Sequence, residues 1–256
     1  MSPFLLASWT LLLREVRHFY RDRSRLTGVL LQPLLFWVLI GTGLSASFRP
    51  AGYDASYLDY FFPGVLLMVV LFTAIFSTFS IIEDRRAGFL QGVLVSPAPR
   101  SAIVLGKVLG GALLGTLQGL LFLLVPLCGL VKLQLSWLGT AELLLWLFLA
   151  GLLLTTLGFS MAWAMTSTQG YHMLMSVLLL PMWLFSGAAF PMAGAPLWLR
   201  LIMQINPLTH GLHLIRGSFG GPVAPDIVTR PWLSALYVAV LAVIGVAVAT
   251  RQVRRS

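Results

Sequence analysis

Five stretches of this chain contain at least 20 consecutive residues without Asp, Glu, Lys or Arg. A helix needs ~20 mostly apolar residues to cross a bilayer. The stretch Leu143–Leu199 has 57 residues, which is too long for one helix, and its polar island Thr166–His172 divides it in two. The pattern predicts an all-α integral membrane protein with six transmembrane helices, expected at residues 26–48, 60–82, 103–131, 143–165, 173–190 and 231–250.

The composition agrees with lipid as the main solvent. Hydrophobic residues make up 58% of the chain and charged residues only 10%, whereas a soluble domain has about 25% charged residues. The net charge is +9, but the basic residues lie at the ends of apolar runs and form no stripe on a polar domain. We therefore expect no nucleic-acid partner.

The Lys and Arg residues predict the orientation, because cytoplasmic loops carry an excess of them. Six spans place both termini on one side, and that side holds 12 basic residues against 5 on the other. We therefore expect both termini, and segment 83–100 between the second and third spans, to be cytoplasmic. The 12 residues are Arg14, Arg17, Arg21, Arg23, Arg25, Arg85, Arg86, Arg100, Lys107, Arg251, Arg254 and Arg255.

Residues 1–25 have the pattern of an amphipathic helix that lies on the membrane surface. One face is basic, and two interpretations remain open for it: a plain anchor beside anionic lipid, or a surface that also borders a partner or a substrate entry path. The predicted apolar face consists of Leu5, Trp9, Leu12, Leu13, Val16 and Tyr20, and the basic face of Arg14, Arg17, His18, Arg21 and Arg25.

Residues 191–230, before the last span, contain two apolar pieces that are too short to cross, Leu197–Ile205 and Leu208–Ile215. Asn206-Pro207 separates them, and proline ends a helix. We expect an outer re-entrant helical pair that breaks at these two residues. His210 and His213 have no third ligand nearby in the sequence, so no metal site is expected.

The third span carries a run of glycines at helical spacing. Missing side chains allow another helix to approach closely, and that helix belongs either to this chain or to a second subunit. Because of this spacing, Gly115→Leu is expected to disrupt assembly more than Gly245→Leu. The glycines are Gly106, Gly110, Gly111, Gly115 and Gly119.

The sequence contains no pattern for nucleotide binding or catalysis. Gly106-Lys107 is followed by Val108, where a P-loop needs Ser or Thr. The predicted span interiors hold no acidic residue of the kind that ion-coupled transporters use. We therefore expect a non-catalytic chain that binds no cofactor and receives its energy from elsewhere.

The segment Ile81–Ser101 reads IIEDRRAGFLQGVLVSPAPRS. From Asp84 to Ser96 it has a helical pattern, with four charges in the first turn and a proline stop, and it is too short to cross. Together with Gly106-Lys107, it resembles the cytoplasmic-loop signature of the membrane subunits of ABC-2-type transporters. Residues 205–217 (INPLTHGLHLIRG) resemble the second landmark of that family.

This resemblance covers essentially the whole chain, so residues 1–256 are expected to form a single transmembrane domain. It implies that segment 83–100 is a coupling helix that docks on a separate ABC ATPase, which uses ATP and Mg. Two ATPase copies are implied, as is a second copy of this permease or a paralogue. The implied docking residues are Glu83, Asp84, Arg85, Arg86, Gly88, Phe89, Leu90, Val93, Ser96, Pro97 and Arg100.

The loop departs from the family at Arg85 and Phe89, where a second Glu and a Thr are common. A Phe-Pro-Arg-Glu loop of the polysaccharide-exporting branch is absent, so the resemblance favours an exporter of drugs, lipids or small metabolites in a bacterial inner membrane. Such an exporter moves a hydrophobic or amphipathic substrate by alternating access. A polysaccharide or glycolipid exporter is the next interpretation, and a passive channel and a membrane-embedded enzyme are disfavoured.

Overall fold

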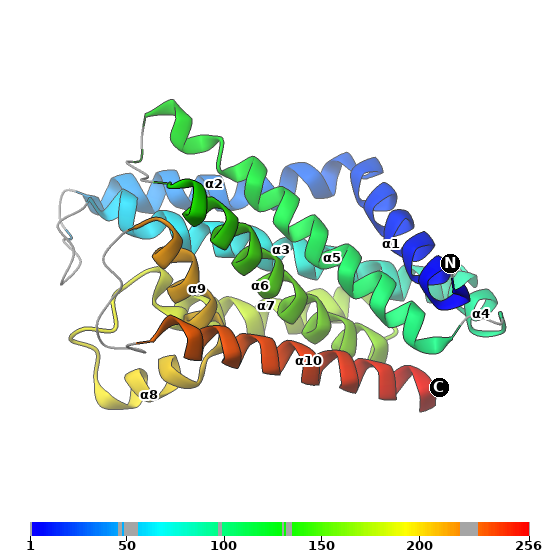
Figure 1. The fold of residues 1–256 in the computed structure, drawn as a ribbon. Coiled ribbons are helices and arrows are strands. Elements are labelled where there is room, and N and C mark those ends of the chain that lie inside the picture. The colour runs from blue at the N-terminus through cyan, green and yellow to red at the C-terminus, as the bar shows by residue number, and fades with distance from the viewer. Residues whose placement is uncertain are drawn as a thin grey trace.

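The computed structural model describes residues 2–45, 48, 56–96, 99–129, 131, 135–220 and 230–255. Within these residues the chain is helical, with no strand, which confirms the predicted all-α class (Figure 1). The helices are α1 (Pro3–Arg21), α2 (Arg23–Ser45), α3 (Tyr57–Arg86), α4 (Phe89–Leu94), α5 (Arg100–Phe122), α6 (Trp137–Ala164), α7 (Thr168–Trp183), α8 (Leu197–Ile205), α9 (Pro207–Ser218) and α10 (Pro231–Arg255). A 3₁₀ turn, Val125–Cys128, follows α5, and a π-helical turn, Leu184–Ala188, extends α7.

Six helices are long and apolar enough to cross a membrane, as predicted: α2, α3, α5, α6, α7 with its π-helical turn, and α10. Their ends differ from the predicted ones where capping residues determine them. Ser56 caps α3 by accepting a hydrogen bond from the Asp59 amide, and Ser136 caps α6 by accepting one from Gly139. Both helices therefore begin earlier than the charge-free runs suggested.

Helix α3 forms the centre of the bundle. It packs against α2, α5 and α6 over much of its length and also touches α7 and α9. Almost all side chains between Tyr60 and Ile82 are buried. Helices α2 and α10 lie at the edges and expose most of their surface, so the core consists of α3 surrounded by its neighbours.

The glycines of α5 pack against helices of the same chain. A Cβ on Gly106 would lie 2.7 Å from the Leu11 Cβ of α1, and one on Gly111 would lie 2.5 Å from Thr155 Cγ2 of α6. Gly110 faces Glu15 of α1, Gly115 faces Val70 of α3, and Gly119 faces Leu147 of α6. Of the two interpretations of the glycine run, the structure favours packing within the chain.

The expected ranking of Gly115 above Gly245 does not agree with this packing. A Cβ on Gly115 would lie 3.2 Å from Val70 Cγ1, whereas one on Gly245 would lie 2.8 Å from the Thr156 Cβ. Gly245 of α10 therefore has the tighter contact. Glycine spacing on one helix did not reveal this, because the closeness depends on which side chain the partner helix presents.

The predicted break at Asn206-Pro207 is present between α8 and α9. The Asn206 side chain caps α9 by accepting a hydrogen bond from the Leu208 amide at 3.0 Å. Its Nδ2 donates to the Met182 carbonyl at 2.6 Å and so ties the break to the end of α7. Helix α9 is buried against α6 and α10, while α8 exposes most of its apolar side chains.

Candidate functional site

The N-terminus, the C-terminus and α4 lie at one end of the bundle, which we call the α4 end (Figure 1). Segment 83–100 differs there from its predicted form. Residues Glu83–Arg86 form the last turn of α3, so the prediction that they start a separate loop helix is wrong. The chain turns at Gly88, which has a φ of 75° that favours glycine, and the short α4 follows. Pro97, one of the predicted docking residues, lies outside the described residues.

A buried cluster of charges joins α1, α3 and α5 just above this turn. Lys107 Nζ of α5 lies 2.5 Å from Glu15 Oε1 and 2.7 Å from Asp84 Oδ2, and it also donates to Ser80 Oγ at 3.0 Å. Asp84 accepts two further hydrogen bonds from the Arg14 guanidinium, at 2.5 and 2.9 Å. These five residues, the Lys107 cluster, contain two acids and two bases, so their formal charges cancel.

The members of the Lys107 cluster that carry the central ion pairs are almost fully buried. Lys107 is 4% exposed, Glu15 3% and Asp84 5%. Lys107 was predicted only as one of the cytoplasmic basic residues, and no structural role was predicted for Glu15. The missed signal is the spacing of Ser8, Leu11, Glu15 and Phe19, which places Glu15 on a helix face with two apolar residues.

Helix α1 therefore has a third face that the amphipathic pattern did not distinguish. Leu5, Trp9 and Tyr20 of the predicted apolar face are exposed, as a membrane-facing surface requires. The buried face instead includes Leu11 and Glu15 and packs on α5 at its glycines. This face ties α1 to the bundle.

The other charges at the end of α3 also contact the chain's own helices. Glu83 is paired with Arg25 at the start of α2. Arg85 donates to the Trp163 and Met165 carbonyls at 2.6 and 2.9 Å. Arg86 donates to the Thr166 carbonyl at 2.8 Å. The two arginines thus satisfy carbonyl groups at the C-terminal end of α6, where positive charge is favourable.

These contacts change how the predicted docking residues are interpreted. The side chains of Glu83, Asp84, Arg85 and Arg86 join the end of α3 to four other helices, α1, α2, α5 and α6. The end of α3, from which α4 follows, is therefore tied to most of the bundle. Direct contact of these charges with a partner stays a prediction.

Helix α4 presents only part of its surface to the outside. Leu90 is 2% exposed and packs in the core, which does not agree with its predicted place among the docking residues. Val93 is partly buried against the same core. Phe89 is 36% exposed, and the Arg14 guanidinium lies 3.7 Å from its ring centroid. Gln91 is exposed, and Val95 is 86% exposed.

Two further predicted residues stabilise the connection to α5. Ser96 Oγ donates to the Val93 carbonyl at 2.7 Å and closes the last turn of α4. Arg100 Nη1 donates to the Arg254 carbonyl at 2.9 Å, which links the start of α5 to the end of α10. Both residues therefore hold segment 83–100 in place through hydrogen bonds inside the chain.

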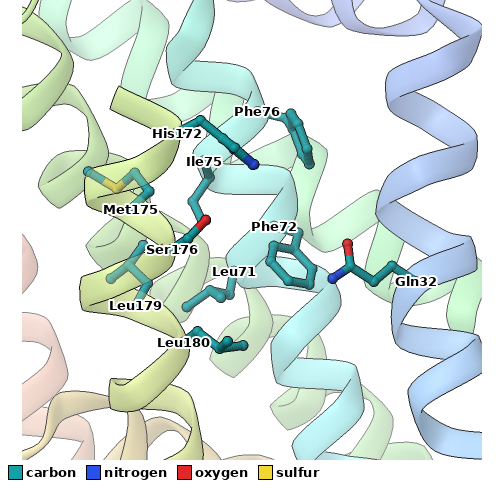
Figure 2. Close-up of a pocket in the computed structure, with 10 residues that line it drawn as sticks. All are labelled: Gln32, Leu71, Phe72, Ile75, Phe76, His172, Met175, Ser176, Leu179 and Leu180. Atoms are coloured by element: carbon teal, nitrogen blue, oxygen red, sulfur yellow. The ribbon is translucent and has the colours of Figure 1, made fainter. Parts of the chain in front are cut away.

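A second feature is a cavity of about 110 Å³ among α2, α3 and α7 (Figure 2). Phe72 and Phe76 of α3 lie between Gln32 on α2 and the facing side of α7, which carries His172 and Ser176. The two phenylalanines are partly buried although α3 is otherwise almost fully enclosed. The lining is therefore mostly apolar, with three polar side chains that offer hydrogen bonds.

A comparison with protein families decides the broad identity. The model described as ABC-2 type transporter matches residues 7–219, which is most of the chain.

The chain belongs to the ABC-2 type transporter family.

Individual relatives of this ABC-2 permease agree with the family. The putative transport permease ycf38 of Cyanophora paradoxa is 29% identical over 199 residues, which cover 77% of this chain and 68% of the relative. Nodulation protein J of Neorhizobium galegae is 25% identical over 237 residues, which cover 90% and 87%. The probable multidrug ABC transporter permease YbhR of Escherichia coli (strain K12) is 24% identical over 177 residues, which cover 68% of this chain and 47% of that protein.

The family and the six apolar helices identify a multi-pass membrane permease. Transporters of this family work with an ABC ATPase, as the sequence analysis expected from the loop signature. The site residues therefore fall into two groups: α4 with its internal ties, and the cavity among α2, α3 and α7.

Proposed function

We propose that this permease exports a hydrophobic or amphipathic substrate from the cytoplasm, driven by a separate ABC ATPase that docks on α4. The observation that carries the proposal is the construction of the α4 end. An exposed surface at Phe89, Gln91 and Val95 lies directly beside charges that hold α1, α2, α3, α5 and α6 together. Only Ala87 and Gly88 separate α4 from the end of α3, so force applied to α4 would reach the spans through this short turn.

The proposed orientation places the α4 end in the cytoplasm of a bacterial cell, below its inner membrane. Its support is the ratio of 12 to 5 basic residues between the two sides. An ATPase at this end has access to cellular ATP and Mg, which the partner uses and this chain does not bind. The permease is then a non-catalytic subunit with both termini cytoplasmic.

The cavity supports the proposed substrate class and the proposed assembly. Phe72 and Phe76 offer aromatic surface to an apolar group, while Gln32 and His172 offer hydrogen bonds to a polar one. The cavity lies between two incompletely buried helices, α2 and α7. A second permease, identical or a paralogue, would close this side and complete a pathway, and each permease would carry one ATPase. Alternating access then consists of changes in the spacing of α2 and α7 around α3.

Substitution of the exposed part of α4 tests the docking role. Val95→Asp places a charge on a residue that is 86% exposed and that makes little contact within the chain. We expect retention of the cognate ATPase by the tagged permease to fall about tenfold, because a charge at the centre of an interface costs more than ~1.4 kcal/mol. Co-purification from membranes that contain both proteins measures this.

The matched control is Leu138→Asp. Leu138 is 69% exposed and starts α6 at the opposite end of the bundle. The control variant should retain the ATPase at the wild-type level. Full retention by the Val95 variant, or equal loss in both variants, would contradict docking on α4.

A further inference from the structure

Helix α1 has a basic face, of which the coupling proposal uses only Arg14. Its buried face packs on α5, and its exposed apolar face carries Leu5, Leu6 and Trp9. Between these two faces lies a basic strip that spans three helical turns. Its polar members recur at spacings of three and four residues and therefore project to one side. These polar members and Leu13 line an open hollow of about 390 Å³. The polar members are Thr10, Arg14, Arg17, His18 and Arg21.

The positive charge in this hollow is largely unbalanced. Arg14 is paired with Asp84. Arg17 and Arg21 are exposed, and neither forms an ion pair with any acidic side chain in the described parts of the chain. Two guanidinium groups one helical turn apart attract an anion, and their planar donors suit phosphate oxygens.

The surface beside the hollow is apolar and aromatic. Trp9 is 54% exposed, Leu6 56% and Tyr20 39%, and they lie on the side of the basic strip that faces away from α5. Trp and Tyr are typical of the boundary between membrane and water. A ligand that satisfies both surfaces needs a phosphate group and an acyl chain together.

We propose that the basic strip of α1 is a binding site for the headgroup of an anionic phospholipid. Arg17 and Arg21 contact the phosphate, His18 donates a further hydrogen bond, and Trp9 and Tyr20 pack against the acyl chains. The proposal does not depend on the ATPase, since it concerns the membrane-facing side of α1.

Arg14 connects this site to α4. It lines the hollow, donates two hydrogen bonds to Asp84, and lies over the Phe89 ring. A phosphate in the hollow competes with Asp84 for this guanidinium. Occupancy therefore loosens the contact between α1 and the first residue of α4, and amide exchange in Phe89–Leu94 should be faster in phosphatidylglycerol nanodiscs than in phosphatidylcholine nanodiscs.

Native mass spectrometry of the delipidated full chain in detergent tests the site directly. Phosphatidylglycerol and phosphatidylcholine of equal chain length are the probes. We expect the wild-type chain to prefer phosphatidylglycerol, and the Arg17→Gln/Arg21→Gln variant to lose about 30-fold of that preference, the effect of two charges near an anionic surface. The control, Arg254→Gln/Arg255→Gln, removes two exposed basic side chains from the same end of the molecule and should keep the preference.

Several outcomes would overturn the proposal. Equal binding of the two lipids by the wild-type chain would exclude a headgroup site, and an equal loss in both variants would show attraction to net charge alone. Displacement of phosphatidylglycerol by glycerol 3-phosphate would assign the hollow to a free anion. Added salt should weaken the preference of the wild-type chain for phosphatidylglycerol, because exposed charges are screened. A preference that salt leaves unchanged would exclude an electrostatic site. This measurement uses the wild-type chain alone, so it holds even if the variant fails to fold.

Discussion

Replacement of Lys107 by methionine is the sharpest test of how α1, α3 and α5 are held together. Lys107 lies 2.5 Å from Glu15 and 2.7 Å from Asp84 in a site where all three are at most 5% exposed. Removal of one partner from a buried ion pair leaves a charge without compensation and costs about 3–5 kcal/mol. Here the two carboxylates would share only the Arg14 guanidinium, so one negative charge stays unbalanced.

We expect the Lys107→Met variant to unfold about 10 °C below the wild type, since each kcal/mol shifts the midpoint by about 2–4 °C in a domain of this size. Thermal unfolding in detergent, followed by tryptophan fluorescence, measures the shift. Arg251→Met serves as the control, because Arg251 is an exposed cation on α10, and its midpoint should stay within about 2 °C of the wild type.

The double variant Lys107→Met/Glu15→Gln tests the charge balance rather than the loss of a side chain. Arg14 and Asp84 remain as a neutral pair, so we expect the double variant to be more stable than Lys107→Met alone. A double variant whose loss equals the sum of the two single losses would refute the reasoning, because residues that do not interact are additive.

Two further predictions concern packing and pH. Gly111→Ala should lower the free energy of unfolding by about 1–3 kcal/mol, because the new Cβ would lie 2.5 Å from Thr155 Cγ2. Gly28→Ala is the control, because a Cβ there has no atom within 4 Å. Equal thermal unfolding midpoints for the two variants would contradict the packing. Burial lowers the pKa of His213 below its usual value. As the pH falls, the unfolded chain therefore binds a proton at His213 at a higher pH than the folded chain does. The free energy of unfolding should then decrease as the pH drops below about 6.5. His213→Gln should show a smaller fall in melting temperature between about pH 7 and pH 5.5; an unchanged slope would assign the pH dependence to other groups.

The sequence predicted the spans and the breaks well, because both depend on local composition. Five charge-free runs, the longest divided by the polar island Thr166–His172, defined six helices, and Asn206-Pro207 marked the break between α8 and α9. The predicted positions of the helix ends were less accurate, because capping residues such as Ser136 lie outside the apolar runs.

The interior of the α4 end was not predictable from the sequence by pattern alone. Glu83, Asp84, Arg85 and Arg86 were expected to start a loop helix and face a partner. Instead, the first three each contact another helix of the same chain, and Arg86 donates to the Thr166 carbonyl just after α6. These contacts join residues up to 80 positions apart, and a local periodicity cannot show them. The buried pairing of Glu15 with Lys107 was missed for the same reason.

The central claim is that ATP acts on the α2–α3–α7 cavity through α4. Spin labels at Gln32→Cys and Ser176→Cys, which line opposite sides of this cavity, report the spacing of α2 and α7 once Cys128 is replaced by Ser. In the reconstituted complex, pulsed electron paramagnetic resonance should show a shifted distance distribution when the ATPase is arrested with ATP and vanadate, and Val95→Asp should abolish the shift. An identical distribution in the ATP-free and arrested states, in a complex that hydrolyses ATP, would contradict the account.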